Sequence, residues 1–219
     1  MGSEYTARHG EEAVQIQVRG APVDWVSGIW NLPEADPPAR RVVRPRGSAR
    51  MQLSVSCDRT AEFSPSRGFL VLRFQYAYTE RIEREGKQRP PDRQPMLEAV
   101  HRQAAGILRQ RFPEARIVFA GKSMGGRMGG YLAAEEDVAA LAYLGYPLHP
   151  PGQARAAARP VPLRYPAEPV PCRARAMPAM RPGAAQAALE TYGGPTTLEV
   201  IEGADHSFQV LRSTGPLRR

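Results

Sequence analysis

Apolar and polar residues alternate or cluster along the chain in patterns that predict both strands and helices. Residues 14–18 and 25–30 alternate with a period of two, which predicts an antiparallel pair of strands. Residues 68–74 form a continuous apolar run, typical of a strand buried on both faces of a parallel sheet. Apolar residues at helical spacing predict a helix over 96–108. His101 lies off its apolar stripe, so we expect His101 to be solvated.

Later runs continue this succession of elements. Residues 138–146 and 196–201 predict two further strands, whereas the charged, proline-bearing stretch 79–93 predicts a loop. With 219 residues, 42% of them hydrophobic, the chain suits one domain with a sizeable core. We therefore expect a single α/β domain over residues 1–219, with a mostly parallel sheet and helices on both of its faces.

Composition excludes several classes of protein. No apolar run approaches the roughly 20 residues of a membrane span, and the first twelve residues are too polar for a secretory signal. We therefore expect a cytoplasmic protein with no membrane partner. The two cysteines, Cys57 and Cys172, match no metal-binding spacing, so we expect neither a metal nor another cofactor.

The net charge of +8 comes from two arginine-rich windows, residues 40–67 and 154–181, each with a net charge of +5. Neither basic window shows clear periodicity, and the second carries six prolines, so we expect both to be irregular and to contain no central strand. Excess positive charge can mark a nucleic-acid partner. Neither window interleaves aromatic residues with the charge, so we expect no nucleic-acid partner.

Residues 117–128 carry the strongest chemical signal. An apolar run leads into Gly-x-Ser-x-Gly centred on Ser123, and small residues follow that suit a helix lying close against a sheet. This pattern indicates a nucleophile elbow, in which side chains at the flanking glycine positions would collide with neighbouring backbone. Ser123 is then the nucleophile and the Met124 N–H an oxyanion donor. A buried strand and a glycine-rich helix without chemistry form the alternative interpretation.

His206 follows the last predicted strand. A serine after a middle strand and a histidine after the last strand occur in the chain order of an α/β hydrolase, which makes His206 the candidate general base for Ser123. A purely structural histidine in this turn is the alternative.

Four other residues are candidates for binding substrate. Lys122 and Arg127 flank the elbow and would favour an acidic substrate, although packing on the helix surface explains them as well. Tyr76 and Tyr78 follow a buried strand at the end where open α/β sheets place their ligands. Half-buried packing at the rim of the sheet is the alternative role for the two tyrosines.

Four motifs occur in order along the chain: Phe69–Tyr76, Gly121–Met128, Leu144–Gly152 and Glu202–Phe208. Together they resemble a family of short bacterial α/β hydrolases related to dienelactone hydrolase. The same family includes the hydrolase-like domains of testis-expressed proteins and of a chromatin-complex (NSL) subunit. The resemblance implies an α/β-hydrolase fold with Ser123 as nucleophile and His206 as base.

The chain departs from this family within the two basic windows. The family carries a His-Gly-x-Gly turn that supplies a second oxyanion amide, and residues 42–54 contain no such turn. It also carries an aspartate in a Gln-Gly-Thr-Arg-Asp run before the histidine strand. Between residues 153 and 189 the only acidic residue is Glu168. The oxyanion turn and the triad acid are both missing from the sequence as written.

A shift of reading frame would account for both losses. If Pro171–Met177 were encoded CCG TGC AGG GCA CGC GCG ATG, reading from the last base of the proline codon gives Val-Gln-Gly-Thr-Arg-Asp. We hypothesise that each basic window is an out-of-frame stretch bounded by compensating shifts.

These observations favour a serine hydrolase that acts on an ester or related acyl bond of a small-molecule acyl substrate, impaired by the two losses. A non-catalytic, hydrolase-like scaffold or interaction protein is the alternative. The sequence leaves the oligomeric state open.

Overall fold

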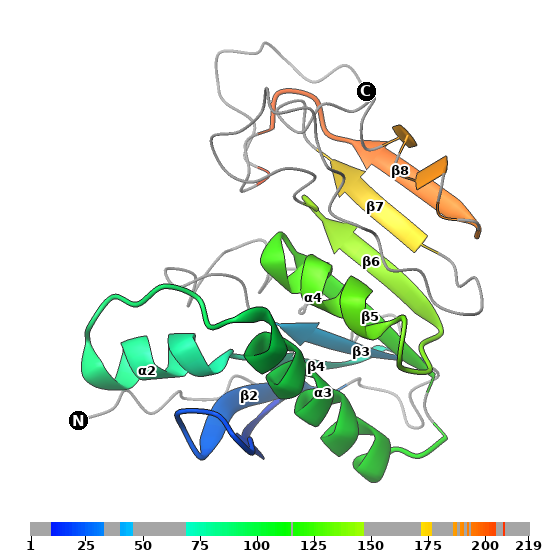
Figure 1. Cartoon of the computed structure of the whole chain (residues 1–219). Helices are drawn as coiled ribbons and strands as arrows, with labels where there is room; N and C mark the ends of the chain where they lie inside the picture. The colour runs from blue at the N-terminus through cyan, green and yellow to red at the C-terminus, as the bar shows by residue number, and fades with distance from the viewer. Residues whose placement is uncertain are drawn as a thin grey trace.

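The described strands form one eight-stranded sheet with the order β1-β2-β4-β3-β5-β6-β7-β8 (Figure 1). It is seen in a computed structural model of the chain. The structure describes residues 10–32, 40–45, 69–114, 116–146, 172–176, 186–187, 189–190, 192, 194–204 and 208.

Three described helices lie between β4 and β6 in the chain. The strands are β1 (Glu11–Gln17), β2 (Trp25–Asn31), β3 (Arg40–Pro45), β4 (Phe69–Phe74), β5 (Ile117–Lys122), β6 (Ala140–Leu144), β7 (Cys172–Ala176) and β8 (Thr196–Val200). The helices are α2 (Ala77–Glu85), α3 (Gln94–Arg111) and α4 (Met124–Leu132).

Strand direction sets where the carboxyl ends of the strands lie. β1 pairs antiparallel with β2, and β2 pairs antiparallel with β4, which confirms the predicted opening pair. Every later neighbour pair, from β4–β3 to β7–β8, is parallel. The parallel strands therefore all end at one edge of the sheet, and that edge carries the residues that follow β5, β7 and β8.

The two faces of the sheet differ in what they bury. Helices α3 and α4 pack against each other and against the central strands (Figure 1). The main core lies on the face covered by α3 and α4, and it includes Leu70, Leu72 and Phe119. Because side chains alternate along a strand, their neighbours in sequence point to the opposite face, which we call the second face. A smaller apolar cluster on that second face gathers around Val71 and includes Val118. The prediction that helices cover both faces is not tested by the described residues.

A polar group is also buried on the second face of the sheet. Arg73 of β4 forms an ion pair with Glu11, and their side chains are only 2% and 6% exposed. The Arg73 Nε donates to Oδ1 of Asn31 at 2.7 Å, and the Asn31 amide donates to Glu11 Oε1 at 3.0 Å. Because each buried charge has polar partners, these three residues join β1, β2 and β4 without leaving an isolated ion.

The prediction of a loop over residues 79–93 is wrong for its first part. Helix α2 occupies 77–85 and ends at Gly86, which adopts the left-handed conformation (φ 69°). Its buried residues include Tyr78 and Ile82, and Arg84 forms an ion pair with Glu80 one turn earlier. Charge pairs spaced four residues apart and a terminal glycine are ordinary helix signals, which the high charge of this segment obscured.

The prediction that both basic windows are irregular is wrong for one run in each. β3 pairs with β4 and β5, and β7 pairs with β6 and β8, so both are interior strands of the sheet. A five-residue run without proline inside the second window is long enough for a strand, because ladder hydrogen bonds use the backbone. The rest of both windows, including Glu168, lies outside the described residues.

His101 is buried rather than solvated, which corrects the sequence prediction. Its side chain on α3 is 0% exposed and lies between Phe74 and Phe119, with ring centroids 5.1 and 4.9 Å away. Neither ring nitrogen has a hydrogen-bond partner within the described part of the chain. Burial lowers the pKa of His101 to about 3, so the imidazole is neutral at neutral pH.

Stability should therefore fall as the pH is lowered. Below pH 6.5 the unfolded state binds a proton at His101 that the folded state does not bind until about pH 3. We expect this group alone to lower the free energy of unfolding by about 2 kcal/mol between pH 7 and pH 5. Urea denaturation of wild type and His101→Leu across this range measures the effect.

The variant keeps every other titrating group, so the difference between the two pH profiles isolates His101. The variant should show the flatter profile. Parallel profiles would mean that His101 is protonated equally well in the folded and unfolded states.

Candidate active site

Ser123 stands at a sharp turn between β5 and α4. Its backbone has φ 52° and ψ −119°, a conformation outside the usual regions for a residue with a side chain. Two hydrogen bonds hold it there: the Ser123 N–H donates to the Leu144 carbonyl on β6 at 2.9 Å, and the Arg127 N–H donates to the Ser123 carbonyl at 3.1 Å. A strained serine between a parallel strand and a helix has the backbone geometry of a nucleophile elbow.

Glycines make this turn possible. A Cβ atom on Gly121 would lie 2.3 Å from the backbone carbonyl carbon of Gly125 and from the backbone nitrogen of Gly126. A Cβ atom on Gly126 would lie 2.8 Å from the Gly121 carbonyl oxygen. These contacts confirm, for Gly121, the predicted collision of a flanking side chain with neighbouring backbone. The strand and the helix can approach this closely only without side chains at these positions.

Met124 is the first residue of α4, directly after Ser123. The first N–H groups of an α-helix have no carbonyl partner within the helix, and they carry the positive end of its dipole. The Met124 N–H is therefore suited to an anionic oxygen beside Ser123. The oxyanion role assigned to it from the sequence stays a prediction.

The candidate base lies outside the described residues. His206 belongs to 205–207, which the structure does not describe, whereas Ala204 and Phe208 on either side are described. Strand β8 ends at Val200, at the same edge of the sheet as Ser123. The chain order that suggested His206 is thus compatible with the topology, and its pairing with Ser123 stays a prediction.

The two cations that flank the elbow lie in different surroundings. Lys122 is 2% exposed and ends β5, with its Nζ 6.0 Å from the ring centroid of Phe208. Arg127 is partly buried on α4, and its Nε is buried without a hydrogen-bond partner in the described part of the chain. Contact of either residue with a substrate is untested.

The two tyrosines after β4 are fully buried. Tyr76 and Tyr78 are 0% and 1% exposed, and their rings stack with centroids 6.5 Å apart. Burial raises the pKa of Tyr76 well above its usual value, and the neighbouring Tyr78 and Glu98 raise it further. Both tyrosines are more deeply buried than the half-buried alternative proposed from the sequence, and a role in binding substrate stays a prediction.

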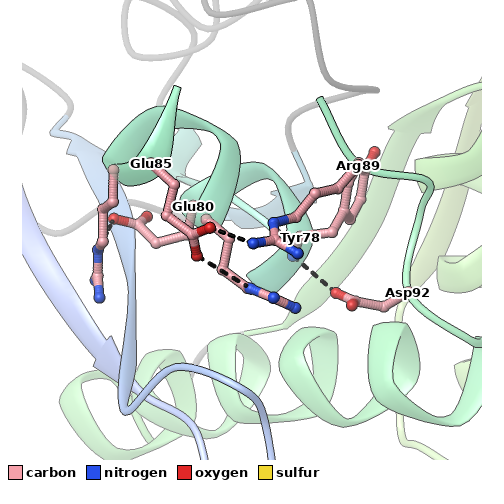
Figure 2. A network of polar contacts seen from close by, with 7 residues as sticks. Tyr78, Glu80, Glu85, Arg89 and Asp92 are labelled. Carbon is pink, nitrogen blue, oxygen red and sulfur yellow. Dashed lines mark hydrogen bonds and ion pairs between the residues drawn. The ribbon is translucent and has the colours of Figure 1, made fainter. Parts of the chain in front are cut away.

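A polar network that sequence reasoning missed fixes the start of α2 (Figure 2). The Tyr78 N–H donates to Oδ2 of Asp92 at 2.7 Å. Glu80, only 3% exposed, accepts a hydrogen bond from the Ser27 N–H on β2 at 2.8 Å. Carboxylates that accept from free N–H groups at a helix start are favourable there. The sequence shows that this stretch is rich in acidic residues. It does not show which backbone N–H groups they accept from, because those groups lie 14 and 53 residues away.

No described helix has the length and apolar character needed to cross a membrane. Within the described residues, no group of three or more histidine, cysteine or acidic side chains is arranged to hold a metal ion.

Comparison with known proteins identifies the family. The sequence profile described as "Alpha/beta hydrolase domain" matches residues 46–218, most of the chain. The chain belongs to the alpha/beta hydrolase family. A comparison with curated protein sequences gave no match.

Solved structures share the fold of this alpha/beta hydrolase at low sequence identity. An alpha-beta serine hydrolase homologue from Coxiella burnetii is 16% identical with a TM-score of 0.69, covering 94% of this chain and 92% of the other. An a/b serine hydrolase without lid from Xanthomonas campestris is 18% identical (TM-score 0.67; 94% and 89%). Dienelactone hydrolase from Anabaena variabilis is 21% identical (TM-score 0.68; 91% and 88%). These likenesses confirm the predicted fold.

The different surroundings of Gly121 and Gly106 predict opposite effects of replacing each by alanine. Gly121→Ala places a methyl group against fixed backbone, so we expect the free energy of unfolding to fall by about 1–3 kcal/mol or more. Gly106→Ala, in the middle of α3 with no atom within 4 Å of the new Cβ, should raise it by about 0.5–1 kcal/mol. Urea denaturation midpoints measure both.

Equal midpoints for the two variants would show that β5 and α4 are less closely packed than described. Because both substitutions add one methyl group to a glycine, Gly106→Ala is the matched control.

Proposed function

We propose that this alpha/beta hydrolase is a serine hydrolase that acts on an ester or related acyl bond of a small-molecule substrate. The observation that carries the proposal is the strained backbone of Ser123 at the junction of a parallel strand and a helix. Maintaining such a conformation costs on the order of 1–3 kcal/mol, and residues of this kind cluster at functional sites. A helix that merely packed on the sheet would not need a strained serine at its start.

The chemistry follows from the three residues in their proposed roles. Ser123 Oγ attacks the acyl carbon while His206 accepts the hydroxyl proton, and the Met124 N–H stabilises the resulting oxyanion. Collapse of the tetrahedral intermediate forms the acyl-enzyme, and the leaving alcohol takes its proton from His206. Water, deprotonated by the same histidine, then releases the acid and restores the serine.

We also propose that the enzyme is impaired because two parts of the machinery are absent. No acidic residue other than Glu168 lies between residues 153 and 189, and residues 42–54 carry no His-Gly-x-Gly turn. A histidine without its acid partner loses the group that fixes its tautomer and stabilises the imidazolium. These absences favour the second candidate, a non-catalytic scaffold with a hydrolase fold.

The position of β7 supports the out-of-frame hypothesis. β7 is Cys172–Ala176, and β8, which precedes the candidate histidine, lies next to it in the sheet. The alternative reading of these codons gives Val-Gln-Gly-Thr-Arg, followed by Asp at the boundary between Ala176 and Met177. That aspartate would directly follow β7, at the edge of the sheet that also carries Ser123.

Further parts of the proposal rest on the sequence. Arg127 lies four residues after Ser123 on α4, and a guanidinium there would suit an acyl substrate that carries an anionic group. We also propose the relationship to the testis-expressed and chromatin-complex (NSL) proteins, a cytoplasmic location, and the absence of a nucleic-acid partner.

The first test replaces the proposed nucleophile. Hydrolysis of a small activated ester such as 4-nitrophenyl acetate should be lost in Ser123→Ala, because the variant has no hydroxyl to acylate. His206→Gln should lose it as well. Ser27→Ala, on β2 and separated from β5 by two strands of the sheet, is the control and should leave the rate unchanged. A rate in Ser123→Ala equal to that of wild type would refute the assignment.

The second test restores the missing parts. A chain in which residues 40–67 and 154–181 are translated in the alternative frame should turn over the same ester about 10⁴-fold faster, the size of effect that loss of a triad acid produces. Restoring only the second window should recover most of the gain. Equal turnover by the restored and original chains would show that the acid and the turn are supplied elsewhere.

A further inference from the structure

We propose that Lys122 is a positioning residue: its ammonium group restrains Phe208, and through the chain this restraint limits the positions open to His206, two residues earlier. This inference rests on the proposed function, because it assigns His206 the role of general base. It gives Lys122 a structural task in catalysis instead of the contact with an acidic substrate that its sequence position suggested.

Lys122 is a buried cation next to the nucleophile. Its side chain is 2% exposed, and the backbone turns into the Ser123 elbow at the next residue. Alternation along β5 places Gly121 toward α4, so Lys122 points to the opposite face of the sheet, the face of Val118 and Ala120. The ammonium group is therefore not directed at the helix that carries the oxyanion amide, and its burial leaves little room for contact with a substrate.

Phe208 supplies the π face that Lys122 meets. The Lys122 Nζ lies 6.0 Å from the Phe208 ring centroid, within the range of a cation–π interaction. Phe208 has φ 60°. Among the described non-glycine residues, only Ser123 also has a positive φ. A bulky residue in this conformation is strained, and it persists only where surrounding contacts determine it. The contact with Lys122 is one such restraint.

One contact therefore links the two segments that supply the proposed nucleophile and base. Lys122 is bonded directly to Ser123, and Phe208 follows His206 by two residues. Two residues of extended chain span at most about 7 Å, so fixing Phe208 limits His206 to positions within that reach. A general base must come within hydrogen-bond reach of the nucleophile, about 2.6–3.2 Å, so a wider range of positions for His206 would lower the rate.

The choice of lysine is informative in this chain. Of 30 lysine and arginine residues only two are lysines, Lys87 and Lys122. Lys87 is exposed after α2, whereas Lys122 is buried at the elbow. A compact ammonium on an unbranched stem fits a narrow buried position, whereas a planar guanidinium needs more room. Lys87 also provides a matched control for removal of a lysine charge.

Hydrogen exchange tests the contact without any requirement for activity. Peptides that cover residues 201–210 should exchange faster in Lys122→Met, which keeps the length of the side chain but removes its charge, and in Phe208→Leu, which removes the π face. The double variant should exchange no faster than the single variants, because both remove the same interaction. Phe208→Tyr should exchange like wild type, and so should Lys87→Met. Unchanged exchange of 201–210 in Lys122→Met overturns the proposal.

Steady-state kinetics on a neutral activated ester test the positioning role. Lys122→Met and Phe208→Leu should lower kcat by about 10- to 30-fold with little change in KM, because a desolvated cation–π contact is lost while substrate contacts remain. Phe208→Tyr should retain the wild-type kcat. An increase in KM confined to anionic esters would instead assign Lys122 to substrate binding and would overturn the positioning role.

The two proposals fail in different ways. If wild type and Ser123→Ala are equally inactive while 201–210 loosens in Lys122→Met, the contact is real but the serine hydrolase proposal fails, and the positioning role fails with it. If wild-type activity depends on Ser123 and His206 but Lys122→Met changes neither exchange nor kcat, only the inference about Lys122 is overturned.

Discussion

The close approach of β5 to α4 is the constraint on which the candidate site depends. Two glycines allow the backbones to pass within a distance that no Cβ atom would permit, and the chain then reverses through a strained serine. The hydrogen bond from the Ser123 N–H to Leu144 anchors this reversal to β6. The strain at one residue is thus supported by backbone contacts on two sides, one with α4 and one with β6. The contact with β6 forms because the parallel sheet holds β5 and β6 in register.

The two faces of the sheet have different chemistry. One face packs apolar and aromatic residues against α3 and α4, and even its histidine is kept neutral by burial. The other face buries charges, namely the Arg73–Glu11 pair and the Lys122 ammonium. A buried charge destabilises a fold unless a polar or charged group compensates it. Each buried charge on this face therefore requires a particular neighbouring group, whereas an apolar side chain can pack against many.

Most of the sheet and the elbow could be predicted from sequence because both have local signals. Alternation revealed β1 and β2, a continuous apolar run revealed β4, and the glycine spacing around Ser123 revealed the turn. The strand β7 was missed because the prolines of its window seemed to exclude a strand, although Cys172–Ala176 alternates apolar and polar residues. Backbone pairing with neighbours on both sides holds this short run in the sheet.

Burial of individual polar side chains was harder to predict. His101 lies four residues after Leu97 and three before Ala104, so helical spacing puts it on the buried face of α3, and the sequence prediction misplaced it. The rings that enclose it come from strands remote in sequence. The contact between Lys122 and Phe208 likewise joins distant segments. Sequence reasoning found the residues that make the elbow, but their partners depend on the tertiary structure.

The position of β3 between β4 and β5 has a consequence for how the chain acquires its structure during synthesis. β3 leaves the ribosome before either of its neighbours. β4 follows and can pair with one edge, but the other edge has no partner until β5 has been synthesised much later. Parallel pairing between such distant segments is slow, because a long loop must close before any ladder hydrogen bond forms. The nascent chain therefore carries an open strand for much of its translation, and a chaperone that shields this strand would favour correct assembly.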